Sequence, residues 1–256
     1  MGNELEKEST DLVTDSTKAH SVPHPSHSAV RKDDGEVTRS QHIHRIVDFD
    51  CPLIESQHDP NDLARELSRI LKKRDISLTS AQRTLLKDYK TEKNMYYIFT
   101  EPTIPEEAKI LAYSSLFNFL IFQGQLTKRV TIELNPKPSE QWDGETSEEN
   151  GYAMITLWSQ DHIRDLNVRL VRYLGITLQE LTNAFLAIYG CVECRRNPKW
   201  QGEADHGEAW KDMMVAIQEA VEDHSFLDLD LKLGGLGAPA EGSRPGGILP
   251  SDALSR

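Results

Sequence analysis

Two cysteines in the C-terminal half of the chain have the spacing of half a metal site. Cys191 and Cys194 are separated by two residues, and thiolates at this spacing supply two of the four ligands that a structural zinc ion normally takes. The sequence contains no second Cys-x-x-Cys pair, so His206 or His224 would have to complete the site. A redox role is disfavoured because the pair follows a predicted helix instead of preceding one. We therefore interpret both as reduced structural cysteines, with a bound zinc ion as the alternative.

Five further histidines lie in the first 48 residues, and metal binding is a possible use for them. Their spacing is irregular and the surrounding segment is polar, which favours incidental histidines over a metal site. They are His20, His24, His27, His42 and His44.

A second group of polar residues stands on a predicted helix before the cysteines. Residues i and i+4 share one helical face, so the side chains at positions 179 and 183 lie together on this helix, next to position 180. Here the residues are Gln179, Glu180 and Asn183. Amide oxygens are poor zinc ligands compared with imidazole. Thr177 and Glu180 also have the spacing of a capping box, and Gln179 and Asn183 can hydrogen-bond to each other.

The elements that position these groups follow from the spacing of apolar residues. Asp59 as a cap and Pro60 in the first turn predict a helix over 59–75, and a second helix begins near Thr79 or Ser80. This helical pair, over 59–91, is either a preface to the main domain or a separate partner-binding hairpin.

An α+β domain is predicted over 105–224, with a small sheet packed against helices. Its predicted elements are a helix over 105–124, a strand over 130–134, a polar loop over 135–150, a strand over 152–158, and helices over 161–174, 178–189 and 207–222. The expected core is Leu116, Leu120, Val130, Ile132, Ile155, Leu157, Leu181, Phe185, Ile188 and Met214.

Composition limits the classes of function. Residues 1–48 and 233–256 are polar or rich in Gly and Pro, so both are predicted to be disordered tails. The net charge of −12 argues against direct nucleic-acid binding. Neither a signal peptide nor a membrane-spanning apolar run is recognisable, and three cysteines do not suggest a secreted disulfide framework. We expect an intracellular protein of the nucleus or cytoplasm that does not enter a membrane.

Three local strings resemble the SprT-like family, the zinc metallopeptidases that include the Spartan proteases. The segment 116–126 is similar to the family's early helix, with a Phe-Asn pair and a closing Gly-x-Leu. The segment 177–185 falls where many members have Thr-Leu-x-His-Glu-x-x-His-Ala, and 205–210 looks like the His-Gly-x-x-Trp segment that carries the third zinc ligand. The matches occur in the family's order and span about half the chain.

The resemblance implies a zincin-like fold whose metal site has degenerated. Gln179 and Asn183 stand where the family has its two helical zinc ligands, so only His206 remains of the expected three. Without the ion, Glu180 has no acidified water to work on, and its implied role as general base becomes that of a relic. We therefore expect no cofactor, with zinc possible, and no working zinc protease.

The expected function is that of a catalytically inactive SprT-like protein that binds an unidentified protein partner, which by resemblance alone would relate to chromatin. The alternative is an active metallopeptidase with unconventional ligands, such as His206 with Cys191 or Cys194. A third reading gives the binding role to the tails and to the 59–91 helices, on an inert scaffold.

Overall fold

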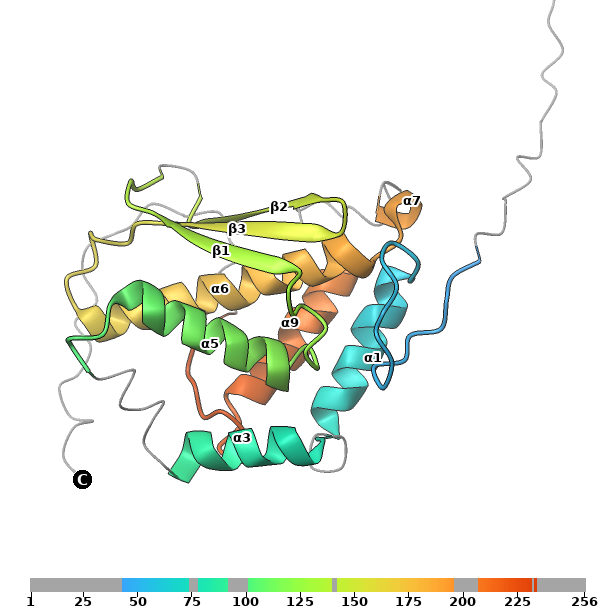
Figure 1. Cartoon of the computed structure of the whole chain (residues 1–256), viewed down its shortest axis with the longest axis horizontal. Helices are drawn as coiled ribbons and strands as arrows, with labels where there is room; N and C mark the ends of the chain where they lie inside the picture. Colours follow the sequence, from blue (N-terminus) through green and yellow to red (C-terminus); the bar gives the residue numbers. More distant parts are fainter. Residues whose placement is uncertain are drawn as a thin grey trace, which may run out of the picture. The chain divides into compact units, whose positions relative to one another are not determined.

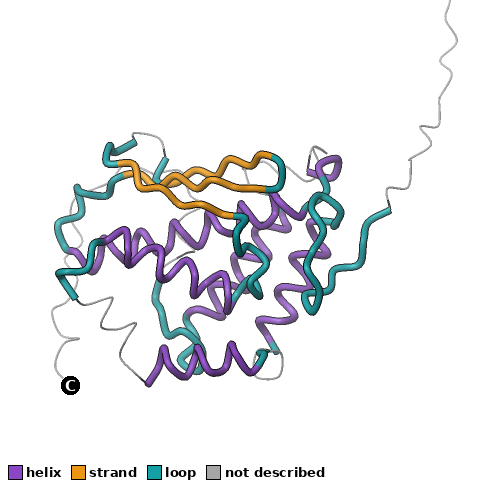
Figure 2. Tube along the Cα trace, viewed as in Figure 1, coloured by secondary structure: helices purple, strands orange, loops and turns teal. Residues whose placement is uncertain are grey.

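The computed structural model describes residues 43–73, 78–91, 101–139, 142–195, 207–231 and 233. The chain divides into two units, 1–41 and 42–256, and all described residues belong to the second. In that unit a three-stranded sheet lies on one side of the helices (Figures 1 and 2). The α+β class is therefore confirmed. None of the helices in the described ranges has both the length and the apolar character needed to cross a membrane.

Three strands form the sheet, in the order β1-β3-β2. β1 is Val130–Asn135, β2 is Gly144–Glu149 and β3 is Tyr152–Trp158. β3 pairs with β1 in parallel and with β2 in antiparallel register. The interpretation of 135–150 as one loop is therefore wrong, because its second half is the edge strand β2. Asn150 and Gly151 both have positive φ, 54° and 76°, as a tight hairpin turn requires.

The helix that crosses beneath the sheet, α6, runs without a break over Leu166–Tyr189. Asp165 caps its start by accepting hydrogen bonds from the backbone of Asn167 and Val168. The predicted break at Gly175, between helices over 161–174 and 178–189, is therefore wrong, and so is the capping box at Thr177 and Glu180, since both residues lie in the helix interior. Glycine in a helix costs about 1 kcal/mol relative to alanine. Burial of every residue from 173 to 182 outweighs that cost here.

The helices before the sheet agree with the predicted positions. α1 is Pro60–Lys72, capped by the Asp59 side chain, and α3 is Ser80–Thr91. α5 is Glu106–Leu120, and the chain then turns through Gln123 and Gly124, which have positive φ. The buried Gln82 amide fastens α3 to the end of α5 by donating to the Phe119 carbonyl at 2.7 Å. The predicted helical pair thus packs on the rest of the unit.

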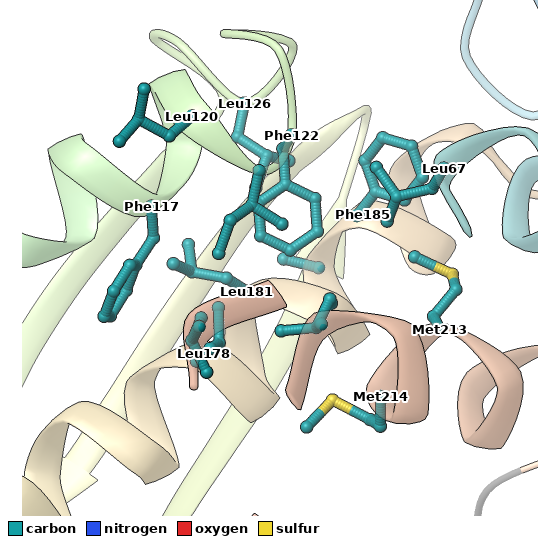
Figure 3. Packing of buried hydrophobic residues seen from close by; sticks show 14 of the residues in the cluster. Leu67, Phe117, Leu120, Phe122, Leu126, Leu178, Leu181, Phe185, Met213 and Met214 are labelled. Carbon is teal, nitrogen blue, oxygen red and sulfur yellow. The ribbon is translucent and has the colours of Figure 1, made fainter. Parts of the chain in front are cut away.

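One hydrophobic core connects these elements. α9, Glu208–Val221, packs beside α1 and α6, and α7 is the short helix Val192–Arg195 after α6 (Figure 1). Figure 3 shows side chains of α1, α5, α6 and α9 meeting in this core, including Leu67, Phe117, Leu181, Phe185 and Met213. The expected core residues are buried, except that Val130 and Ile132 are partly buried and pack against it.

Candidate functional site

The carboxylate of Glu180 is buried between helix α6 and strand β2. Its side chain is 6% exposed. The Thr146 hydroxyl of β2 donates to Glu180 Oε2 at 2.7 Å, and the Asn183 amide donates to the same oxygen at 2.9 Å. A carboxylate that receives two such hydrogen bonds is well satisfied where it stands.

Backbone contact closes one side of this carboxylate. A Cβ atom added at Gly144 of β2 would lie 2.6 Å from Ile176 Cγ2 and 2.9 Å from Glu180 Cγ. Both distances are too short for ordinary packing. The start of strand β2 therefore lies directly on α6, and only glycine allows that approach.

The residues at the expected catalytic metal site do not fit a zinc ion. Gln179 is 9% exposed and Asn183 is partly exposed. The Asn183 amide bonds to Glu180, whereas a bond with Gln179 was expected. His206 lies outside the described residues. The two amides are neutral oxygen donors where imidazoles are needed, so no catalytic step through a metal follows from this group.

A different set of metal-binding side chains meets at the end of α6. Donor atoms of His44, Cys191 and Cys194 all lie within 4.8 Å of one another, and His44 Nε2 lies 3.1 Å from Cys194 Sγ. His44, which the sequence interpretation grouped with the incidental histidines, thus lies beside both cysteines. His224 does not complete the cysteine pair, because it is 91% exposed and its Nδ1 lies 2.6 Å from Asp228 Oδ1.

Backbone hydrogen bonds bring these distant residues together. Residues 56–58 run beside the end of α6 in a parallel arrangement, with a bridge between His58 and Gly190. The Cys191 N–H donates to the His58 carbonyl at 2.7 Å. The Arg45 N–H donates to the Gln57 carbonyl at 3.0 Å, which holds the segment that carries His44.

The imidazole of His58 supports this segment from inside. It is buried, with Nδ1 donating to the Arg45 carbonyl at 3.2 Å and Nε2 accepting from the Ile54 N–H at 3.2 Å. Burial lowers the pKa of His58 below its ordinary value. His58 is therefore a neutral structural residue with both nitrogens in use.

Burial favours the protonated thiol of Cys194 when no metal is bound. Burial, followed by the hydrogen bond and charge of Cys191, raises the pKa of Cys194 to about 11. On the other side of the imidazole, His44 Nδ1 lies 3.8 Å from Asp59 Oδ2. A metal ion here would have to displace thiol protons.

Glu180 and the cysteines belong to separate sites. Glu180 and Tyr189 are nine positions apart on α6, which corresponds to about 13 Å along a helix. Glu180 therefore cannot act on water bound to a metal at the cysteines. The sequence interpretation missed Thr146 and Gly144, for which residue type gives no signal, and it noticed Asp59 only as a helix cap.

An apolar groove of about 700 Å³ opens between α3, α5 and the first residues of β1. β1 is an edge strand, and no strand among the described residues pairs with its outer side. The main apolar residues that line the groove are Leu85, Leu111, Leu116, Phe119, Leu126, Val130, Ile132 and Leu181.

Comparison with protein-family models finds no match, and no curated protein matches the chain. The SprT-like resemblance thus stays a prediction based on the three strings quoted above.

Proposed function

We propose that this chain is a non-catalytic protein of the SprT-like type that works by binding another protein. The observation that carries the proposal is the state of Glu180. Its carboxylate, which would be the general base in an active relative, is buried and bonded to Thr146 and Asn183. A general base must instead reach a water molecule and a substrate.

The neighbouring residues support the same conclusion. Gln179 and Asn183 offer amide oxygens where a zinc ion needs imidazoles. The close approach of Gly144 to Ile176 and Glu180 leaves β2 seated on the helix at this point. Hydrogen bonds and packing thus take the place that a metal and its water would need.

The binding surface that we propose is the groove between α3, α5 and β1. Its walls are largely apolar, and Val130 and Ile132 at the start of the edge strand β1 line it. An extended peptide can pair with such an edge while its alternate side chains enter apolar pockets. The partner segment that fits best is therefore extended, with apolar side chains at alternate positions facing the groove.

Absence of catalysis is tested with the full chain supplied with zinc. We expect no zinc-dependent cleavage of a casein-type substrate. The wild-type protein and a Glu180→Ala variant should show the same lack of zinc-dependent cleavage. Cleavage that a chelator abolishes and that Glu180→Ala also abolishes would contradict the proposal.

Binding is tested with synthetic peptides of the proposed chemistry, measured by fluorescence anisotropy. A Leu111→Lys substitution places a charge in the groove and should weaken peptide binding at least about tenfold, which corresponds to roughly 1.4 kcal/mol. Val215→Lys is the matched control, because Val215 is an exposed apolar residue on α9 outside the groove lining. Equal effects of the two variants, or no peptide binding to the wild-type chain, would reject the groove.

A further inference from the structure

We propose that His44, Cys191 and Cys194 form a zinc site that fastens the segment before α1 to the end of α6. His44 is far from the two cysteines in the sequence, 150 positions before Cys194. Their donor atoms nevertheless lie within 4.8 Å of one another. The site is independent of the proposed function, since it lies about three helical turns from Glu180 and outside the groove lining.

The spacing of the donors is close to what zinc requires. Zinc–sulfur bonds of about 2.3 Å and zinc–nitrogen bonds of about 2.0 Å place neighbouring donors of a tetrahedron roughly 3.5–3.8 Å apart. His44 Nε2 and Cys194 Sγ are 3.1 Å apart, and no pair in the group exceeds 4.8 Å. Shifts of several tenths of an ångström to about one ångström would therefore bring the three donors around one ion.

The chemistry of the donors selects the metal. Two thiolates and one imidazole favour zinc over calcium or magnesium, which prefer oxygen ligands. Three protein donors leave one tetrahedral position for a further ligand.

A carboxylate stands behind the histidine, as it does in many zinc sites. Asp59 Oδ2 lies 3.8 Å from His44 Nδ1, on the side of the ring away from Cys194. A shift of about one ångström on metal binding would let the Nδ1–H donate to this carboxylate, which would then fix the orientation of the ring. Asp59 Oδ1 meanwhile accepts from the Asn61 N–H at the start of α1, so the carboxylate is already held on that side.

The backbone prepares the site before any metal binds. The Cys191 N–H donates to the His58 carbonyl, and the Arg45 N–H donates to the Gln57 carbonyl. Those bonds hold both Arg45 and Cys191 against residues 57 and 58. The fold therefore already brings His44 and Cys191 close together. Zinc then adds direct bonds across a junction that backbone hydrogen bonds and the stacking of Phe49 on Phe185 already hold together.

The test begins with the full chain purified under reducing conditions without chelators. We expect one zinc ion per chain by mass spectrometry of the metal. X-ray absorption should show two sulfur neighbours at about 2.3 Å and nitrogen or oxygen neighbours at about 2.0 Å. A coordination shell without sulfur, or no zinc bound after one equivalent is added, would overturn the proposal.

Variants separate the ligands from the rest of the chain. His44→Gln and Cys194→Ala should each reduce zinc affinity by at least about 100-fold, and Asp59→Asn by about 10–100-fold. Asparagine caps a helix as well as aspartate does, so Asp59→Asn removes the carboxylate but keeps the start of α1. Cys51→Ser, at an exposed cysteine outside the group, is the control and should bind zinc like the wild-type chain.

Hydrogen exchange provides a second readout that does not require the variants. Chelation of the metal should increase amide exchange in residues 43–58 and 190–194, and exchange in β1 and β3 should not change. Circular dichroism identifies any variant that has unfolded. Unchanged zinc affinity in folded His44→Gln, or a disulfide between Cys191 and Cys194 under reducing conditions, would overturn the assignment.

Discussion

At the scale of single residues, the contact between strand β2 and helix α6 depends on the absence of one side chain. The backbone at Gly144 approaches Ile176 and Glu180 so closely that a Cβ would stand 2.6 Å and 2.9 Å from their nearest atoms. The same approach brings the Thr146 hydroxyl to the Glu180 carboxylate. A small change at Gly144 therefore affects both packing and hydrogen bonding.

We predict that Gly144→Ala destabilises the protein by about 1–3 kcal/mol, because the added methyl group forces β2 away from α6. Urea unfolding followed by circular dichroism measures the effect. Glu145→Ala changes an exposed residue next to it and should alter stability by no more than about 0.5 kcal/mol. If the two variants were equally stable, the close contact at Gly144 would not hold in solution.

Residue types alone could predict some of the candidate sites and not the rest. The amides at 179 and 183 are sufficient to exclude a conventional zinc helix, and Cys191-x-x-Cys194 is sufficient to suggest half a site. His44 could not be assigned, because nothing local in a polar segment reveals a partner 150 positions away. Thr146 was hidden for a similar reason, since its role depends on which strand crosses α6.

At the scale of elements, burial overrides local signals. Gly175 predicts a helix end, yet α6 continues through it because its neighbours are enclosed by the sheet and by other helices. The strand β2 was missed because its sequence is polar, although Asn150-Gly151 is a typical hairpin turn. The spacing of apolar residues predicted α1, α3, α5, α9, β1 and β3 well.

Helix α3 is held to the C-terminal segment by a hydrogen bond from the Tyr89 hydroxyl to the Leu227 carbonyl, at 2.9 Å. We predict that Tyr89→Phe lowers stability at neutral pH by about 0.5–1.5 kcal/mol. Tyr152→Phe is the control, because Tyr152 is exposed. Equal free energies of unfolding for the two variants, measured in urea at neutral pH, would contradict the prediction.

Alkaline pH gives a second test of the same tyrosine. Burial raises the pKa of Tyr89 to about 12. A phenol whose pKa is raised by folding contributes stability that is present below about pH 10 and is lost as pH rises through the folded value. The wild-type chain should therefore lose stability above about pH 10 more steeply than Tyr89→Phe does. Parallel losses in the two proteins would show that Tyr89 is not buried.

At the scale of the whole molecule, the segment 43–58 belongs to the folded unit, although residues up to 48 were expected to form a disordered tail. Phe49 stacks on Phe185 of α6, with ring centroids 5.9 Å apart. Val47 packs against the same core. Residues 1–42 and 234–256 of the two expected tails lie outside the described residues.

We predict that a chain beginning at residue 50 is less stable than one beginning at residue 43 by about 2 kcal/mol or more. The shorter chain loses the buried part of Val47 and the stacked ring of Phe49. Thermal unfolding measures the difference in stability between the two chains. A chelator is present so that bound zinc does not contribute. Equal melting temperatures would show that the segment does not support the core.

The charge of β2, the strand at one edge of the sheet, affects how copies of this protein associate. The outer strand β2 exposes Glu145, Glu148 and Glu149, and such a row of negative side chains repels an identical row on a second copy. This repulsion opposes edge-to-edge pairing between the β2 strands of two copies at neutral pH. The net charge of the chain falls toward zero as the solution approaches its isoelectric point near 5.2, so self-association of the chain should increase there.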